Sequence, residues 1–190
     1  MAIRSLKSGT FSRSGMVGNP VIMPGSYDSI ATTTVGAGGA SSVTFSSIPS
    51  TYSHLQVRIT TRSTFGANEW PIFVQLNGSG TGYAYHDLQG NGSAVSGSGS
   101  SSQSLMQLGD TSAANGTASS FGVFIIDILD YADTNKNKTS RTFYGYELNG
   151  SGKIGMRSGL WANTTAVSSL SFGTGGNFAQ HSSFALYGVN

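Results

Sequence analysis

The sequence contains no cysteine, so it has neither a disulfide framework nor a thiol nucleophile, and its redox compartment is left undetermined. Charged residues are also scarce, at 9% of the chain, against roughly 25% in an average soluble domain. No apolar run approaches the ~18 residues of a membrane span, and the N-terminus lacks the apolar segment of a signal peptide. We therefore expect a protein that is synthesised in the cytoplasm and has no membrane partner.

Motifs of common catalytic sites are missing as well. The chain holds no G-x-S-x-G nucleophile elbow, no G-x-x-x-x-G-K phosphate loop and no H-E-x-x-H zinc motif. The three histidines, His54, His86 and His181, are too far apart in the sequence to show metal-ligand spacing. His86 and Asp87 would point to opposite faces of a strand, so we interpret them as a surface pair. We expect no enzymatic activity, no metal and no cofactor.

Three carboxylates, Asp127, Asp130 and Asp133, lie within seven residues. In a strand, Asp127 and Asp130 point to opposite faces and do not converge. The segment from Asp133 onward begins like a calcium loop, but it lacks the sharp-turn glycine and the bidentate glutamate. We expect Asp133 and Asn135 to make a turn, and Asp127 to pair with a neighbour such as Arg141.

The positive charge is concentrated before the first acid, Asp28. Arg4, Lys7 and Arg13 give this segment a charge of +3, and the other seven Lys and Arg against eight Asp and Glu leave the remainder at −1. A nucleic-acid groove would need a basic stripe with interleaved aromatics on a folded face. We therefore expect no direct contact with nucleic acid.

Residues 1–25 keep no period of two or 3.6 for long and are rich in glycine and proline. They are predicted to form an extended arm that becomes ordered only against a partner; the alternative is a frayed terminus. The apolar content favours the arm, because a disordered tail seldom carries so many large apolar residues. The candidate attachment residues are Arg4, Leu6, Lys7, Phe11, Arg13, Val17, Val21 and Ile22.

The most apolar stretch is FGVFIIDILDY, residues 121–131. Its β-branched and aromatic residues, and the turn-rich segment that follows, favour a strand over a helix. As a strand, it would place Val123 and Ile125 on one face and Phe124 and Ile126 on the other, so neither face suits water. We predict that it lies at the centre of a sheet, with its second face covered by another sheet layer, a loop or another subunit.

Short strand-like segments separated by Gly, Ser, Asn and Pro fill the rest of the chain, and no segment has a convincing helical period. We take 91–104 as a long exposed loop, because it is small and polar. About eleven strands in residues 26–190 predict a single all-β domain, a β-sandwich of the jelly-roll type. The predicted strands are 27–35, 42–45, 54–62, 70–77, 83–88, 105–108, 121–131, 141–148, 153–161, 167–172 and 183–189.

Strand edges without charges promote association between chains. The low charge of this sequence therefore predicts a homo-oligomer, with a homotrimer as the first expectation. Aromatic residues offer a second kind of contact, because exposed rings can bind sugars, although in a sandwich they are more often core or subunit contacts. The candidates for glycan or subunit contact are Tyr83, Tyr85, Tyr144, Tyr146 and Trp161.

Four segments of residues 27–190 have a familiar pattern: YDSIATTTVGAGGASSVTFSSIPSTYSHLQVRI, FGVFIIDILDYADTNKNKTSRTFYGYELNG, SGLWANTTAVSSLSF and NFAQHSSFALYGVN. They resemble a group of tailed-bacteriophage virion proteins that end in a similar aromatic-rich LYG signature. The resemblance implies a β-rich structural protein on the particle surface, and it brings no catalytic residues.

Two functions are consistent with this resemblance. The chain is either a capsid decoration (cement) protein, attached by its arm to the major capsid protein or another virion protein, or a tail-fibre or tail-tip module that binds a host-surface glycan. A fibre protein usually has a long shaft ahead of such a module, so the arm favours decoration.

Overall fold

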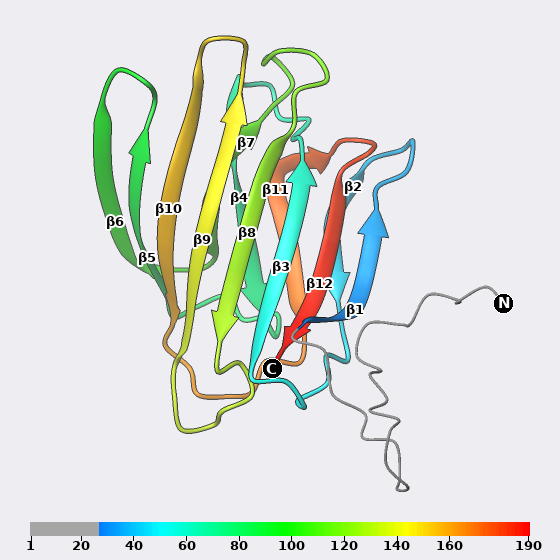
Figure 1. Ribbon diagram of the computed structural model, residues 1–190, viewed down its shortest axis with the longest axis vertical. Helices are drawn as coiled ribbons and strands as arrows, with labels where there is room; N and C mark the ends of the chain where they lie inside the picture. The colour runs from blue at the N-terminus through cyan, green and yellow to red at the C-terminus, as the bar shows by residue number, and fades with distance from the viewer. Residues whose placement is uncertain (1–26) are drawn as a thin grey trace, which may run out of the picture.

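The computed structural model describes residues 27–190, which form twelve β-strands in two antiparallel sheets (Figure 1). The predicted arm lies outside these residues. Residues 27–190 include no helix long and apolar enough to cross a membrane. The strands are β1 Tyr27–Thr34, β2 Ala40–Phe45, β3 His54–Thr61, β4 Glu69–Leu76, β5 Tyr83–Gly90, β6 Val95–Gln103, β7 Met106–Ser112, β8 Gly122–Leu129, β9 Lys138–Glu147, β10 Gly152–Trp161, β11 Leu170–Phe178 and β12 Ser183–Val189.

The strand order is that of a jelly roll with two inserted hairpins. The larger sheet runs β1-β12-β3-β8-β9-β10-β5-β6, and the smaller runs β2-β11-β4-β7. Without β5, β6, β9 and β10, two four-stranded sheets remain, β1-β12-β3-β8 and β2-β11-β4-β7. Along the chain, each of these eight strands lies in the other sheet from the strand before it, as in a jelly roll. The one exception is β7, which follows β4 and lies beside it in the smaller sheet. The predicted all-β sandwich of jelly-roll type is therefore confirmed.

The hairpins β5–β6 and β9–β10 both add to the same side of the larger sheet. They continue it beyond β8 in the order β9, β10, β5, β6, which we call the extension. In Figure 1 the larger sheet faces the viewer, the extension lies to the left, and the smaller sheet lies behind. One sheet of eight strands is thus backed by a sheet of only four.

The core between the sheets follows the period of two in the sequence. Leu55, Val57 and Ile59 of β3 are buried, as are Ile72 and Val74 of β4, and these faces were predicted. Phe124, Ile126 and Ile128 of β8 pack into the same core. The sequence period therefore identifies correctly which residues share a face in the jelly-roll part of the chain.

Strand β8 is central, as predicted, because it pairs with β3 on one side and with β9 on the other. Its second face is not covered by any sheet layer or loop of residues 27–190. Val123 is 54% exposed and Ile125 is 46% exposed. Cover by another subunit stays a prediction.

The prediction of a loop at 91–104 is wrong. This segment contains β6, which pairs along its length with β5 and forms the edge of the larger sheet. Small residues are needed there, because a Cβ on Gly99 would lie 2.6 Å from the Cδ2 atom of His86 on the neighbouring strand. A run of glycine and serine has weak strand propensity, and here backbone hydrogen bonding to β5 outweighs it.

Two Asn-Gly turns were predicted correctly from the sequence. Asn77 and Gly78 have φ angles of 52° and 67°, and Asn149 and Gly150 have 63° and 101°. The second turn closes the β9–β10 hairpin, whereas the first connects β4 of the smaller sheet to β5 of the larger. The Asn77 side chain also accepts hydrogen bonds from the backbone N–H groups of Ser168 and Ser169. It therefore links the β4–β5 connection to the β10–β11 connection.

A pair of substitutions on β8 tests this architecture. We expect Ile126→Asp to lower the free energy of unfolding by roughly 4 kcal/mol, because it buries a carboxylate without a partner. Ile125→Asp should cost less than about 1 kcal/mol, because this side chain points to solvent in the isolated domain. Urea denaturation, at concentrations low enough to keep the chain monomeric, measures both values. Equal losses for the two variants would show that both faces of β8 are buried within one chain.

Candidate functional site

The described residues offer no metal-binding or catalytic cluster to begin from. Within residues 27–190, no group of three or more His, Cys, Asp or Glu side chains is placed to hold a metal ion. Every buried side-chain nitrogen and oxygen of this part of the chain has a hydrogen-bond partner. The feature that the fold leaves unexplained is instead a surface, the outer face of the larger sheet.

Seven large apolar side chains lie exposed on the outer face of β8 and the extension. Their exposed fractions run from 46% to 76%. Monomeric proteins leave single apolar residues exposed, but contiguous groups of this size usually mark an interaction site. We call this group the apolar face; its members are Val123 and Ile125 of β8, Phe143 of β9, Ile154 and Met156 of β10, Leu88 of β5 and Val95 of β6.

Strand register arranges the apolar face in two rows that cross the strands. In the first row every position is a large side chain, and each residue is the direct partner of the next on the neighbouring strand. Direct partners across antiparallel strands have Cβ atoms roughly 5 Å apart, so these side chains touch. The first row is Ile125, Phe143, Met156 and Leu88.

Large and small residues alternate in the second row, which is Val123, Gly145, Ile154, Gly90 and Val95. The glycines leave hollows between the large side chains. One hollow, of about 570 Å³, lies over Gly145, and another, of about 310 Å³, lies over Gly90. The apolar face is therefore a pattern of knobs and hollows.

A polar row borders the apolar face on the side of the first row. It runs Asp127, Arg141, Ser158 and His86 across β8, β9, β10 and β5. The Nε atom of Arg141 donates to Oδ2 of Asp127 at 2.8 Å, which confirms the pair predicted from the sequence. The two charges cancel, so this border presents no net charge beside the apolar face.

Beneath the apolar face, the inner side of the extension is polar. Asp87 and Arg157 form a buried ion pair, with Nε to Oδ1 at 3.1 Å and side chains only 2% and 6% exposed. The hydroxyl of Tyr144 lies 3.2 Å from Oδ1 of Asp87, and Arg157 also donates to Gln107 at 3.1 Å. Burial and the neighbouring charge of Asp87 raise the pKa of the Tyr144 phenol, so it stays a neutral donor.

A second cluster extends this polar layer along β4, β7 and β10. Lys153 forms ion pairs with Glu69 and, at 3.4 Å, with Asp110, and the hydroxyl of Tyr146 bonds to Glu69. Burial raises the pKa of the Asp110 carboxyl, although Lys153 opposes this effect. We call both clusters together the polar seam; its members are Asp87, Gln89, Tyr144, Arg157, Gln107, Glu69, Asp110, Lys153 and Tyr146.

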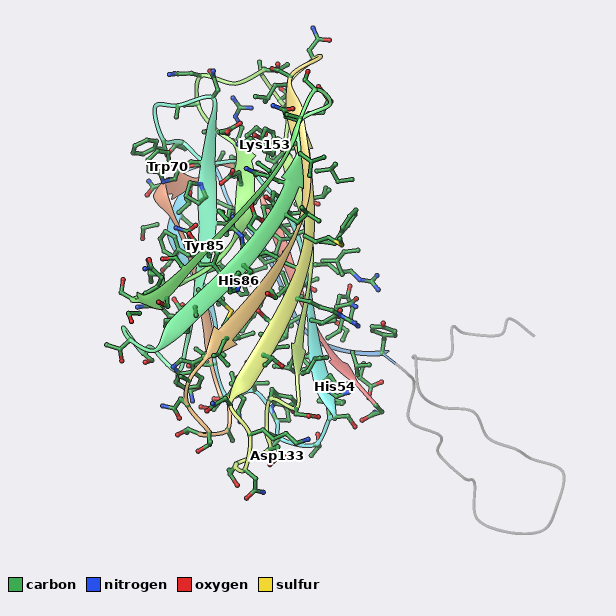
Figure 2. The ribbon with its side chains drawn as sticks, turned by 90° about the vertical axis from the view of Figure 1, so that its left-hand side faces the viewer. His54, Trp70, Tyr85, His86, Asp133 and Lys153 are labelled. Carbon is green, nitrogen blue, oxygen red and sulfur yellow. The ribbon has the colours of Figure 1, made fainter. Side chains whose placement is uncertain are left out.

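The extension thus departs from the usual pattern, because the charged side chains of the polar seam lie inside, next to the core residues Tyr83 and Trp161, and apolar side chains lie outside. Figure 2 views the molecule from the β6 edge, with the smaller sheet and Trp70 to the left and the outer side chains projecting to the right. Sheets that meet water on one face usually expose the polar side. The outer face of the extension is therefore suited to a partner and not to solvent.

Aromatic residues predicted for glycan or subunit contact do not form this surface, which corrects that prediction. Tyr83, Tyr144, Tyr146 and Trp161 are between 0% and 6% exposed. Tyr83 donates to the backbone of the β4–β5 connection and stacks on Trp161, and Tyr144 and Tyr146 belong to the polar seam. Tyr85 is half-buried, and its ring lies 4.6 Å from the guanidinium carbon of Arg157.

Other sequence predictions had mixed outcomes. Asp133 accepts a hydrogen bond from the backbone N–H of Asn135 at 2.8 Å, so the predicted turn is confirmed. Asp87 is buried, so its interpretation as a surface residue paired with His86 is wrong. The eight candidate attachment residues of the arm lie outside the described part of the chain. The sequence predicted that the face of Val123 and Ile125 needs cover, but it did not reveal the other five members of the apolar face, because a strand pattern does not show which of its two faces lies outside.

Two Arg–Asp pairs on opposite faces of the larger sheet provide a matched test of the polar seam. Arg157→Ala leaves the buried Asp87 without its cation and should lower the free energy of unfolding by about 3–5 kcal/mol. Arg141→Ala removes the exposed partner of Asp127 and should cost no more than about 1 kcal/mol. Urea denaturation of both variants measures the difference. Similar small losses would mean that the seam is open to water.

Comparison with known proteins adds no family to this geometry. No family model, curated protein or solved structure matches the chain. A function for the protein therefore rests on the apolar face, on the polar seam beneath it and on the sequence.

Proposed function

We propose that the protein is a non-enzymatic structural subunit of a bacteriophage particle. The observation that carries this proposal is the apolar face, because seven large side chains exposed on a rigid sheet suit a subunit that is buried in an assembly. The sequence resemblance to phage virion proteins supplies the kind of assembly. The polar seam supports a structural role, since its charged groups are paired with one another, and the pair of Asp87 and Arg157 is buried.

Within the particle, we propose that the chain is a capsid decoration protein, held on the shell through residues 1–25. The charge of +3 on this segment favours approach to an acidic protein surface, while the rest of the chain has a charge of −1. Each large apolar side chain that becomes fully covered then contributes roughly 1.5–3 kcal/mol. The segment precedes β1, which is the edge strand opposite the extension.

The alternative is a tail module that binds a host glycan. Four of the five aromatic residues on which that alternative depended are buried. The two rows of the apolar face carry no hydrogen-bonding side chain, and sugars need such groups for recognition. The decoration role is therefore preferred, and glycan binding is left as an outcome of the test.

Removing residues 2–24 tests the attachment. We expect the truncated chain to unfold in urea like the full chain but to bind purified particles of its phage at least about a hundredfold more weakly, because it loses several apolar contacts. Co-sedimentation with particles measures the binding. Undiminished binding would place attachment on the sandwich and favour the tail module, for which a glycan array is the next measurement.

Two full-length variants separate the contributions of charge and apolar burial. Replacing Leu6, Phe11 and Val17 by serine should abolish most binding at all salt concentrations, because burial does not depend on salt. Replacing Arg4, Lys7 and Arg13 by serine should slow association and remove most of its salt dependence. Identical behaviour of the two variants would contradict the proposed division of roles.

A further inference from the structure

We propose that the apolar face is a homotypic interface, in which two copies of this chain pack their larger sheets face to face about a twofold axis. This inference rests on the proposed role as an assembly subunit and names the partner of the apolar face. It concerns β8, β9, β10, β5 and β6, and it does not involve residues 1–25.

The size of the apolar face fits such a pair. Seven large side chains, each about half exposed or more, present on the order of 700 Å² of apolar surface, above the roughly 300–600 Å² of the largest patch on a typical monomer. A standard protein interface buries about 800 Å² on each partner. Two copies of this face would therefore bury enough surface for a stable dimer.

The relief of the face is complementary to itself on β9 and β5, whereas on β8 and β10 large side chains occupy both rows. On β9 the knob Phe143 and the hollow over Gly145 are two residues apart, and on β5 the knob Leu88 and the hollow over Gly90 have the same spacing. A twofold axis that runs across the strands between the two rows exchanges the rows. Each Phe143 then fills the hollow over Gly145 of the other copy, and each Leu88 faces the hollow over Gly90.

Electrostatics permit two identical faces to meet. Across β8, β9, β10, β5 and β6, both rows consist of apolar residues and glycine, so pairing of these strands brings no like charges together. Arg58 of β3, the direct partner of Ile125, lies at the end of the first row. At the border, Asp127 and Arg141 already neutralise each other. Two sheets that pack face to face interdigitate their side chains in this way, with about 10 Å between the sheets. The dimer would therefore have four sheet layers, two from each copy.

Among the other occupants, residues 1–25 fit the face less well. This segment carries three cations, whereas Glu147 is the one carboxylate of residues 27–190 that lines the hollows over Gly145 and Gly90. A second copy presents an uncharged apolar surface of the same extent. Face-to-face contact of identical surfaces is isologous and closes at two copies, so it predicts an even-numbered assembly in place of the trimer expected from the sequence.

Sedimentation equilibrium of the full chain tests the inference. We expect a monomer–dimer equilibrium that Phe143→Asp weakens at least about a hundredfold, because the dimer would bury two carboxylates without partners. The control is Ser42→Asp, at an exposed strand position on β2 of the smaller sheet, which should leave the dimer unchanged. A monomeric wild type, a trimer, or a dimer unaffected by Phe143→Asp overturns the inference.

A crosslinking experiment makes the test independent of folding defects in Phe143→Asp. The chain has no cysteine, so Met156→Cys places a single thiol in the first row. A short bis-maleimide should link two copies of this variant and should not link two copies of Ser42→Cys. Absence of the linked product from Met156→Cys, with both thiols reactive, overturns face-to-face pairing.

Particle binding separates this inference from the proposed function. A dimer that does not bind particles supports the homotypic interface and overturns the particle role. A monomeric chain that binds particles only while Phe143 is intact overturns the interface and retains the particle role, with another virion protein on the apolar face. A monomer that binds no particle overturns both.

Discussion

The strands of a sandwich usually have cover on at least one face, and here a sheet of eight strands is backed by a sheet of only four. The jelly-roll half meets this condition in the usual way, with Phe124 and Ile126 of β8 packed against the smaller sheet. Beyond β8 the smaller sheet ends at β7, and the extension continues past that edge (Figure 1). The unequal width of the two sheets determines where the chain places its charges and where it leaves apolar residues exposed.

Along the edge of β7 the inner side of the extension is filled by long polar side chains. Arg157 reaches Gln107 of β7 while it pairs with Asp87, and Lys153 joins Glu69 of β4 to Asp110 of β7. Buried ion pairs contribute little net stability, but a lost partner leaves a buried charge that is costly. The polar seam therefore fixes how the extension sits on the smaller sheet, and this holds the apolar face as a rigid surface.

Local pattern in the sequence predicted a large part of this fold. The alternation of Leu55, Val57 and Ile59 identified a half-buried strand, and the apolar stretch at 121–131 identified the central strand. Two Asn-Gly dipeptides marked turns, and Asp127 was matched with Arg141. These features depend on neighbours in sequence or on the period of two, so they can be read from one chain without knowledge of its sheet pairing.

Long-range pairing decided the rest. The sequence determines that Phe143 and Tyr144 point to opposite faces of β9, but both are aromatic, and only the position of β7 makes Tyr144 the buried one. The Gly-Ser segment of β6 has no strand pattern, and its pairing with β5 comes from backbone hydrogen bonds that carry no side-chain signature. Alternation by itself determined the two faces of each strand, whereas the tertiary structure alone decided which face is covered, because cover depends on which strands of the other sheet lie opposite.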